Sequence, residues 1–449
     1  MNQLAAIRRT PDPDRAIYLA LSLVAALTGR LAAAELTIAP AVELRFQAAD
    51  GLGYQLQTTG NPGNWNDLDS PVIAGQGLIA RLLPAAGDEQ RFFRLEEFPV
   101  RDLNTDLAPI RTQFNVPALA CAVVRSNRIV GVGVVGVRKH GVSEPVTLTD
   151  KWHLGSVTKS FTATLAGILV DEGRLTWQTK LAEVFPDAAP AMHADWKTVT
   201  LEQLLSNRSG APHDLNPSGI WSQLWNHKGT PREQRRFLLE KLTPLPPSAK
   251  PGTAYIYSNA GFALAGAMLE EVMNRSWEDL LTEKLFQPLS LASAGFGVPA
   301  TPRHINQPWG HTFSGTTPVP VEPGTSADNP PGIGPAATVH CSLLDLARYA
   351  AFHVAGELGR GRLMSTATFR KLHADVAGQG YALGWVVGSR PWAGGRTFSH
   401  TGSNTQWYAN VWLAPDRDFA MVIVTNIGGD RAFQATDAVA GKLVSLFLD

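Results

Sequence analysis

Cysteine is scarce in this sequence, with two residues among 449, Cys121 and Cys341. So few thiols exclude a scaffold built on disulfides and a zinc site built on cysteines. Charged residues are also sparse, at 17% of the chain against about 25% in an average soluble domain. The 39 basic residues balance the 39 acidic ones, so bulk charge provides no attraction for nucleic acid or for an anionic membrane.

Long apolar runs are missing after residue 34, where no stretch reaches the roughly 18 residues that a membrane-spanning helix requires. Before that point, three arginines precede an apolar run at 16–28, and three alanines end the segment. This order predicts a secretory signal peptide cleaved before Glu35, with a retained membrane anchor as the alternative. We therefore expect a secreted or periplasmic protein without a stable membrane anchor after cleavage. Export permits a disulfide between Cys121 and Cys341, although two separate buried thiols are the expectation.

Two regions of different character follow this segment. Residues 35–98 contain four short strand-like segments separated by Gly, Pro, Asn and Asp, and no cluster of candidate catalytic side chains. They predict a small β-rich module of unknown role. From residue 99 to 449, helix-like and strand-like patterns alternate, which indicates a larger domain of mixed α and β structure. The predicted domains are therefore 1–34, 35–98 and 99–449.

A Gly-x-Gly-x-x-Gly pattern occurs at Gly131, Gly133 and Gly136, as in dinucleotide-binding sites. Such a site needs a helix immediately after the glycines, so that the helix N-terminus points at the pyrophosphate. Here the glycines lie in a strand-like segment, and a turn at 137–141 follows them. We therefore expect no cofactor, and we assign the glycines to close packing of a neighbouring element against a strand.

The most informative segment begins with Ser156 and Lys159. Apolar side chains recur at helical spacing over 157–169, and Gly173 supplies a helix stop. The serine therefore stands at a helix N-terminus, with the lysine one turn later on the same face. Backbone N–H groups there can stabilise an oxyanion, and a lysine kept neutral by burial can take a serine proton. Taken alone, the pair is weak evidence, because a capping serine beside a surface lysine has the same pattern.

Two further segments place polar residues beside regular elements. Tyr257 and Asn259 follow a Pro-Gly turn and precede an apolar helix predicted at 262–272. Residues 400–403, with the sequence His-Thr-Gly-Ser, fall between two strand-like segments. A second Tyr-x-Asn begins at Tyr408, but it sits on a predicted edge strand, where packing explains it better than chemistry does.

These three pieces, in this order, resemble the serine β-lactamase and penicillin-binding-protein superfamily. The resemblance extends over about 100–445 and includes the connecting stretches 199–212, 251–266 and 283–291. It implies an α+β, β-lactamase/transpeptidase-like fold, in which helices flank an antiparallel sheet and a mostly helical subdomain holds Tyr257. The active site would lie between the sheet and that subdomain.

The resemblance also implies a role for each matched residue. Ser156 is the nucleophile that becomes acylated, Lys159 is its base, and Tyr257 shares the proton network and protonates the leaving group. Backbone N–H groups of Ser156 and Ser403 form the oxyanion hole. The implied substrate-binding set is Asn259, His400, Thr401, Gly402 and Ser403.

The sequence departs from the best-known β-lactamases at two motifs. A tyrosine stands in the second motif, as in class C β-lactamases and DD-carboxypeptidases, and His400 stands in the third, where those β-lactamases have lysine. Histidine titrates near pH 6.5, so we expect this position to lose its charge above that pH and to hold a substrate carboxylate weakly. The alternative is that His400 only hydrogen-bonds within the Ser156 network.

Other catalytic chemistries find no support in the sequence. No serine has glycines at both −2 and +2, no His-Glu-x-x-His occurs, and no metal site is expected. We therefore expect a metal-independent serine hydrolase that acts through a Ser156 acyl-enzyme on an ester or amide. A DD-carboxypeptidase, peptidase or esterase fits better than an efficient β-lactamase. The substrate would be a small molecule or a peptide of the cell-wall type, and a non-catalytic or slow penicillin- or peptidoglycan-binding sensor is the alternative.

Overall fold

The computed structural model describes residues 5–6, 41–48, 51–59, 66–67, 72–73, 77–84, 92–324, 327–375 and 377–448. The chain divides into two compact units, Met1–Val100 and Arg101–Asp449, which are treated separately below. The predicted signal peptide at 1–34 lies outside the described residues, apart from the two residues of β1 (Ala5–Ala6).

The described part of the first unit consists of β-strands. Two long antiparallel pairs form it, β2 with β6 and β3 with β7, and shorter strands add to the second pair. The ring of Tyr54 is buried and lies 5.2 Å from that of Phe46. The strands are β2 (Ala41–Ala48), β3 (Leu52–Thr59), β4 (Asn66–Asp67), β5 (Val72–Ile73), β6 (Gly77–Pro84) and β7 (Phe92–Pro99).

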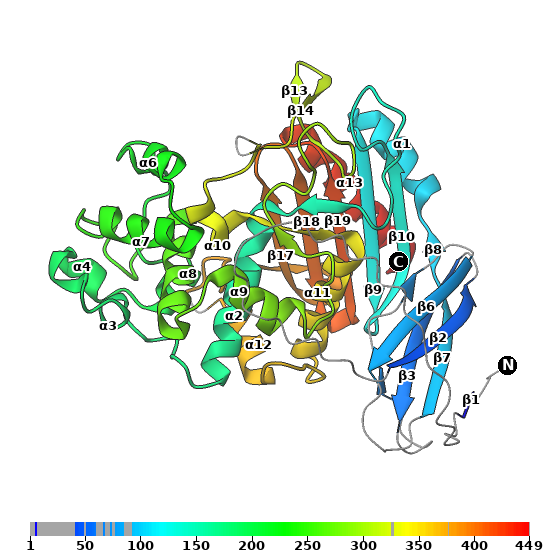
Figure 1. Ribbon diagram of the computed structural model, residues 1–449, viewed down its shortest axis with the longest axis horizontal. Coiled ribbons are helices and arrows are strands. Elements are labelled where there is room, and N and C mark those ends of the chain that lie inside the picture. Colours follow the sequence, from blue (N-terminus) through cyan, green and yellow to red (C-terminus); the bar gives the residue numbers. More distant parts are fainter. Residues whose placement is uncertain are drawn as a thin grey trace, which may run out of the picture. The chain divides into compact units, whose positions relative to one another are not determined.

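A seven-stranded sheet forms the centre of the second unit, in the order β16-β17-β18-β19-β9-β10-β8 (Figure 1). Neighbouring strands are antiparallel, except that β8 runs parallel to β10. The strands are β8 (Arg101–Asp102), β9 (Ala118–Arg125), β10 (Arg128–Gly136), β16 (Val386–Arg390), β17 (Gly395–Ser403), β18 (Tyr408–Ala414) and β19 (Phe419–Thr425).

The prediction that Tyr408 lies on an edge strand is wrong. Its strand, β18, pairs with β17 on one side and with β19 on the other. The short strand β16 occupies that edge of the sheet instead. The side chain of Tyr408 packs partly buried against the hydrophobic core, as the prediction of a packing role requires.

Helices cover both faces of the sheet. The helices α1 (Asn104–Phe114) and α13 (Asp430–Phe447) pack on one face, and α11 (Leu343–Glu357) packs on the other (Figure 1). Alternation along β9 turns Leu119, Cys121 and Val123 toward α1 and α13, into one buried apolar cluster. Helices flanking an antiparallel sheet confirm the predicted α+β fold.

The glycines of β10 serve close packing, as expected. A Cβ at Gly133 would lie 2.7 Å from Leu107 Cδ1, and one at Gly131 would lie 3.3 Å from Leu103 Cδ1. The bare backbone therefore lets α1 lie directly on the strand. The strand continues to Gly136 and no helix follows it directly, so the dinucleotide pattern has no phosphate-binding geometry here.

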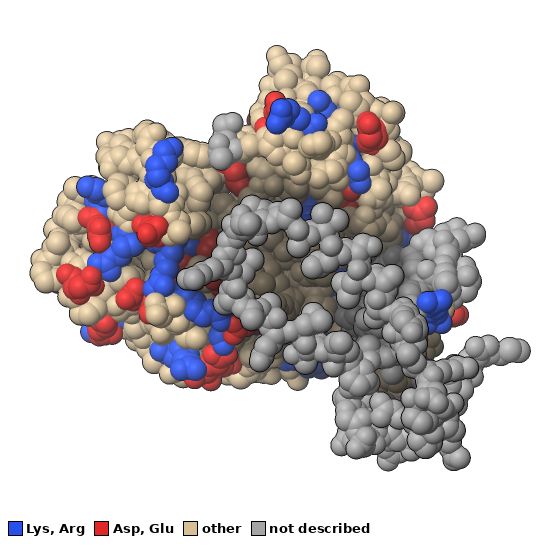
Figure 2. Space-filling view, in the orientation of Figure 1, with Lys and Arg blue, Asp and Glu red and all other residues tan. Residues whose placement is uncertain are grey.

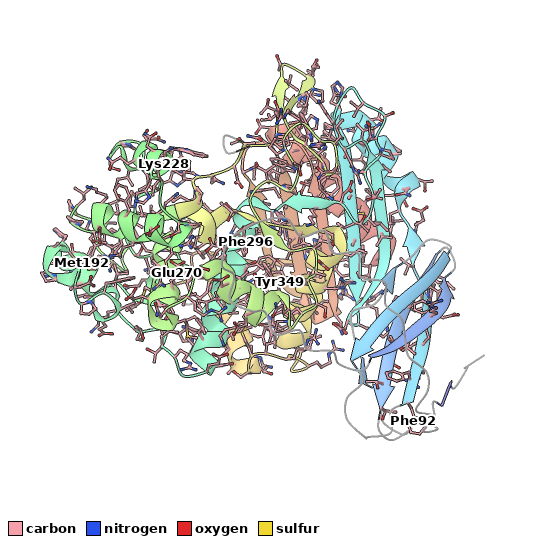
Figure 3. The ribbon with its side chains drawn as sticks, viewed as in Figure 1. Phe92, Met192, Lys228, Glu270, Phe296 and Tyr349 are labelled. Carbon is pink, nitrogen blue, oxygen red and sulfur yellow. The ribbon has the colours of Figure 1, made fainter. Side chains whose placement is uncertain are left out.

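A mostly helical subdomain lies beside the sheet, centred on α8. Arg235 of α7 is fully buried and donates two hydrogen bonds to Glu270 of α8, at 2.6 and 2.9 Å. It also donates to Glu278 of α9, at 2.7 and 3.1 Å, so one guanidinium joins three helices (Figure 3 labels Glu270). The helices are α3 (Leu181–Val184), α4 (Ala194–Lys197), α5 (Leu201–Leu205), α6 (Ile220–Asn226), α7 (Pro231–Leu242), α8 (Asn259–Met273) and α9 (Trp277–Leu281).

Shorter elements connect the sheet and the helical subdomain. Helix α2 (Thr158–Asp171) is buried along most of its length, and α10 (Gly334–Ala337) and α12 (Thr366–Leu372) pack against it. The remaining strands are β11 (Lys151–His153), β12 (Gly295–Phe296), β13 (Gly310–Ser314), β14 (Thr317–Val321) and β15 (Val339–Ser342). Cys121 in β9 and Cys341 in β15 are buried free thiols, as expected.

Surface charge in the helical subdomain is mixed. Figure 2 shows Lys and Arg interspersed with Asp and Glu over this part of the molecule. The described atoms of the visible face therefore display no continuous band of one sign, in keeping with the balanced composition.

Candidate active site

Ser156 and Lys159 meet at the start of α2. The serine lies in a 3-10 turn, Gly155–Val157, that leads directly into the helix. Lys159 is fully buried, and its Nζ lies 3.2 Å from Ser156 Oγ. The same nitrogen lies 2.7 Å from Asn259 Oδ1 and 3.1 Å from the carbonyl oxygen of Ala336. The first turn of α2 thus brings the predicted nucleophile and base into hydrogen-bonding distance.

The surroundings of Lys159 favour a neutral amine. Burial lowers the pKa of this lysine well below its ordinary value, and none of its three polar contacts is a carboxylate. A neutral amine has two N–H groups, which Asn259 and Ala336 accept, and one lone pair. That lone pair is left for the hydroxyl proton of Ser156, which is what a general base needs.

Tyr257 completes the proton network from the helical subdomain. Its hydroxyl is hydrogen-bonded to Ser156, and burial raises its pKa above the ordinary value, so the phenol keeps its proton at neutral pH. Asn207 holds the loop that carries it, accepting from Ser258 N at 3.0 Å and from Ile256 N at 2.8 Å. Tyr257 can therefore donate a proton beside the nucleophile.

Two glycines allow β17 to lie directly against the turn that carries Ser156. A Cβ at Gly402 would lie 2.0 Å from the carbonyl oxygen of Leu154, and one at Gly155 would lie 2.3 Å from Ser403 N. Gly155 also has a φ of +50°, which other residues rarely adopt. Only bare backbone permits this approach, since a Cβ at Gly402 would also lie 2.6 Å from Ser156 N. The backbones of Ser156 and Ser403 thus lie side by side, as the predicted pair of oxyanion donors requires. The sequence prediction included Gly402 but omitted Gly155, whose signal is its place directly before the nucleophile.

His400 is buried, and its environment contradicts the expected titration. Its Nδ1 lies 2.6 Å from the carbonyl oxygen of Thr401, so that nitrogen donates, and Nε2 accepts from the hydroxyl of Tyr381 at 3.2 Å. Burial lowers the pKa of His400 to about 3. The prediction that it loses a proton near pH 6.5 is therefore wrong, because sequence alone does not reveal that the ring is desolvated.

Thr401 is separated from the other predicted residues. Side chains alternate along β17, so Thr401 and His400 point to opposite faces of the strand. The hydroxyl of Thr401 is exposed and hydrogen-bonded to Tyr408. The ring of His400, in contrast, lies 6.4 Å from that of Tyr257, on the side of the proton network.

The sequence analysis did not predict the pair of His153 and Asp328, which supports the turn that carries Ser156. The backbone N–H of Gly155 donates to His153 Nδ1 at 3.1 Å. The other ring nitrogen, Nε2, therefore carries the proton and donates to Asp328 Oδ1 at 3.0 Å. These two hydrogen bonds fix the turn that carries Ser156. Asp328 is 175 residues away from His153 in sequence and carries no local motif.

The described residues contain neither a cluster of metal ligands nor a membrane-spanning helix. Among them, no group of three or more His, Cys, Asp or Glu side chains could hold a metal ion. Within the same residues, no helix is long and apolar enough to cross a membrane.

A sequence model of the family described as Beta-lactamase matches residues 103–445. The chain belongs to the β-lactamase family. This confirms the resemblance drawn from the three motifs, and it identifies the protein as a serine hydrolase of the β-lactamase superfamily.

Named relatives in the family are distant. Penicillin-binding protein 4 of Amycolatopsis lactamdurans is 27% identical over 336 residues, covering 72% of this chain and 84% of its own length. Unguisins hydrolase ungD' of Aspergillus campestris is 26% identical over 372 residues, covering 77% of this chain. Protein flp of Staphylococcus aureus N315 is 21% identical over 337 residues, covering 74% of this chain. The chain spans only 66% of the Aspergillus protein and 64% of the Staphylococcus protein.

Solved structures share the fold of the second unit. The octameric penicillin-binding protein homologue from Pyrococcus abyssi has a TM-score of 0.61 at 22% identity, covering 75% of this chain and 76% of its own. SurE with D-Leu also has a TM-score of 0.61, at 21% identity, covering 77% of this chain and 75% of its own.

Proposed function

We propose that this protein hydrolyses an ester or an amide through an acyl-enzyme at Ser156, with Lys159 as the base. One observation carries the proposal. A fully buried lysine with no carboxylate partner lies 3.2 Å from the serine hydroxyl, and its two other polar contacts are acceptors. A serine hydroxyl is a weak nucleophile at neutral pH, and such a neutral amine is the base that activates it.

The geometry suggests the order of events during acylation. Lys159 takes the proton as Ser156 Oγ attacks the carbonyl carbon, and the N–H groups of Ser156 and Ser403 stabilise the resulting oxyanion. Tyr257 then gives its proton to the departing oxygen or nitrogen and regains one through the network. Water would attack the acyl-enzyme with the same groups acting in reverse, which releases the acid.

The substrate class we propose is a peptide or an ester in preference to a β-lactam. A neutral His400 gives β17 no cation at the position where the best-known β-lactamases carry lysine, so the hold on a β-lactam carboxylate is weak. One relative is named for the hydrolysis of unguisins, and one fold neighbour was solved with D-Leu. The first name supports a hydrolase and the D-amino acid of the second supports a peptide-like substrate. We propose that the protein meets its substrate after export, as a cell-wall-type peptide or a small ester.

A panel of three substrates tests this function. A p-nitrophenyl ester and a D-Ala-D-Ala peptide should be turned over faster than a chromogenic cephalosporin. A fluorescent fluorophosphonate should label the wild type, and peptide mapping should place the label on Ser156. Ser156→Ala should lose both labelling and turnover, while Ser389→Ala, a serine exposed on β16, should keep both. Labelling that survives Ser156→Ala would overturn the assignment.

The alternative of a slow sensor makes a different kinetic prediction. A sensor would acylate in a single burst and then stop, because the acyl group is not released. The connected Ser156, Lys159 and Tyr257 network favours turnover, since the same groups serve deacylation. A stoichiometric burst without steady-state hydrolysis of every substrate would replace the hydrolase by the sensor.

A further inference from the structure

A buried tyrosine that belongs to none of the three motifs lies inside the site. Tyr381 comes from the segment 377–385, between α12 and β16. Its hydroxyl donates to His400 Nε2 at 3.2 Å, and its ring meets the ring of Tyr257 edge to face, at 6.4 Å and 88°. One side chain therefore contacts both strand β17 and the proposed proton donor.

The rings of Tyr257, Tyr381 and His400 form a triangle. The centres of the Tyr381 and His400 rings lie 5.9 Å apart, and each of the other two pairs is 6.4 Å apart. Aromatic rings at such distances attract one another, and each ring limits where the other two can lie. A shift of one ring in this triangle therefore moves the others.

Hydrogen bonds attach this triangle to β17. Nδ1 of His400 donates to the carbonyl oxygen of Thr401 at 2.6 Å, so the imidazole has one orientation. The hydroxyl of Tyr381 then binds the other ring nitrogen. Hydrogen bonds are directional and ring packing is not, so this hydroxyl sets the position of the Tyr381 ring relative to the strand.

The backbone near Tyr381 is fixed on two further sides. The N–H of Gly384 donates to the carbonyl oxygen of Leu205, at the end of α5, across 3.2 Å. A Cβ at Gly384 would lie 2.8 Å from the carbonyl oxygen of Lys159, so the segment packs directly on α2. Tyr381 thus stands where the helical subdomain, α2 and the sheet meet.

We propose that Tyr381 is a positioning residue, which holds Tyr257 where its phenol can protonate the leaving group. The proposal rests on the proposed acyl-enzyme at Ser156 and adds a residue to that mechanism. The step it serves moves the phenol proton to the ester oxygen as the bond between this oxygen and the acyl carbon breaks. In Tyr381→Phe the ring remains but its link to His400 is lost, so the ring can shift and Tyr257 shifts with it.

Leaving groups differ in how much they need that proton. p-Nitrophenolate is a stable anion that departs without a proton, whereas an alkoxide must be protonated as it leaves. The p-nitrophenyl and ethyl esters of butanoic acid share one acyl group and differ in this need. Their kcat/KM values both report acylation, so the ratio between them isolates the step that Tyr257 performs.

The test measures kcat/KM for the two butanoate esters in three proteins. We expect Tyr381→Phe to lower the value for the ethyl ester by about tenfold and that for the p-nitrophenyl ester by about twofold or less. Tyr349→Phe is the matched control, because this buried tyrosine of α11 donates its hydroxyl to Ser160 at 3.0 Å (Figure 3 labels Tyr349). It should leave the ratio of the two esters at the wild-type value.

A double-mutant cycle with His400 tests the route. His400→Leu removes the acceptor of the Tyr381 hydroxyl, so alone it should change the ratio of the two esters in the same direction. Adding Tyr381→Phe to His400→Leu should then change this ratio little further, since the hydrogen bond is already lost. Effects that multiply would overturn the proposal, because Tyr381 would not act through His400.

The remaining outcomes also decide the matter. Equal losses for both esters in Tyr381→Phe would make the residue merely structural, and an equal change of ratio in Tyr349→Phe would make the effect a general one. A wild type that hydrolyses the p-nitrophenyl ester and not the ethyl ester would leave no leaving-group protonation to position. Each of these results overturns the proposal. If Ser156→Ala hydrolyses the p-nitrophenyl ester as fast as the wild type, the proposed function itself fails, whatever the ratio.

Discussion

The hydroxyl of Tyr381 donates a hydrogen bond to Nε2 of His400 across 3.2 Å. Together with donation from Nδ1 to the carbonyl oxygen of Thr401, this contact uses both ring nitrogens in the neutral tautomer. A second proton, on Nε2, would face the hydroxyl proton of Tyr381. It would find an acceptor there only if that hydroxyl turned around. His400 thus belongs to the hydrogen-bonded interior of the site, and it is not a variable charge on its surface.

Substrate charge selectivity should not change through the histidine range. Because burial lowers the pKa of His400 to about 3, the ring stays neutral from pH 8.5 down to pH 5.5. The ratio of kcat/KM for an anionic substrate, the mono-p-nitrophenyl ester of glutaric acid, to that for a neutral one, the p-nitrophenyl ester of pentanoic acid, should be constant over that interval in the wild type. A ratio that falls as the pH rises through 6.5 would show a titrating cation at this position.

The pair of His153 and Asp328 should matter for catalysis more than for binding. Asp328→Ala removes the acceptor that holds the imidazole under Gly155, so the oxyanion donor of Ser156 loses its fixed position. We expect kcat to fall by about 10- to 100-fold with little change in KM. Asp328→Asn keeps an oxygen acceptor and should recover most of the rate. Equal losses in both variants would mean that the charge of Asp328, and not its hydrogen bond, is what counts.

The buried Arg235 should be a strong determinant of stability. Arg235→Ala would leave Glu270 buried without its partner, at a cost of about 3–5 kcal/mol in the free energy of unfolding. The neighbouring Arg236 pairs with exposed Asp187 and Glu240, so Arg236→Ala should cost about 1 kcal/mol or less. Urea unfolding of both variants measures the difference. Similar losses in the two variants would contradict this account of the helical subdomain.

Mild acid should destabilise the protein through His311. Its Nδ1 donates to the carbonyl oxygen of Asn426 and its Nε2 accepts from His140 N, and burial lowers its pKa to about 4. The unfolded chain binds this proton below about pH 6.5, so stability is complete above that pH and declines until about pH 4.

At pH 5 the loss from this one histidine is about 2 kcal/mol relative to pH 7.5. His311→Gln is less stable at pH 7.5, but it should lose correspondingly less on acidification. The measurement is the free energy of unfolding in urea at both pH values for both proteins. The same decline in both would show that other groups bind the protons.

Local patterns predicted the positions of the candidate residues. Helical spacing placed Ser156 and Lys159 on one face of a helix, because residues three apart lie on the same side. The order of the three motifs then supplied their proposed roles. Local sequence also accounts for the hairpin of β9 and β10, in which two apolar segments flank a turn at Ser126. It accounts likewise for the start of α11, where Ser342 accepts from the N–H of Asp345 three residues later. In each case the deciding contacts lie within a few residues of one another, where sequence carries the information.

Properties that depend on distant segments could not be predicted in this way. Whether β18 is an edge or an interior strand depends on β17 and β19 both pairing with it, which no single segment reveals. The desolvation of His400 depends on Tyr381 and Tyr257, whose rings lie 5.9 and 6.4 Å from its own and come from other segments. Asp328 meets His153 only because the folded chain returns past β11. Motif order therefore identifies the chemistry, while pairing between distant segments sets the pKa values and the supporting contacts.

The middle of the central sheet has a consequence for biosynthesis. Strand β9 pairs along its length with β19, and Thr425 Oγ1 donates to the carbonyl oxygen of Ala118 across 307 residues of sequence. At a ribosomal rate of about 5–20 residues per second, the first strand waits about 15–60 seconds for the second. During that time an almost wholly apolar strand has one unpaired edge, which is a template for aggregation. Folding of this unit is thus slow by topology and completes only after its final strand is made, so a chaperone that shields β9 should raise the yield of soluble protein.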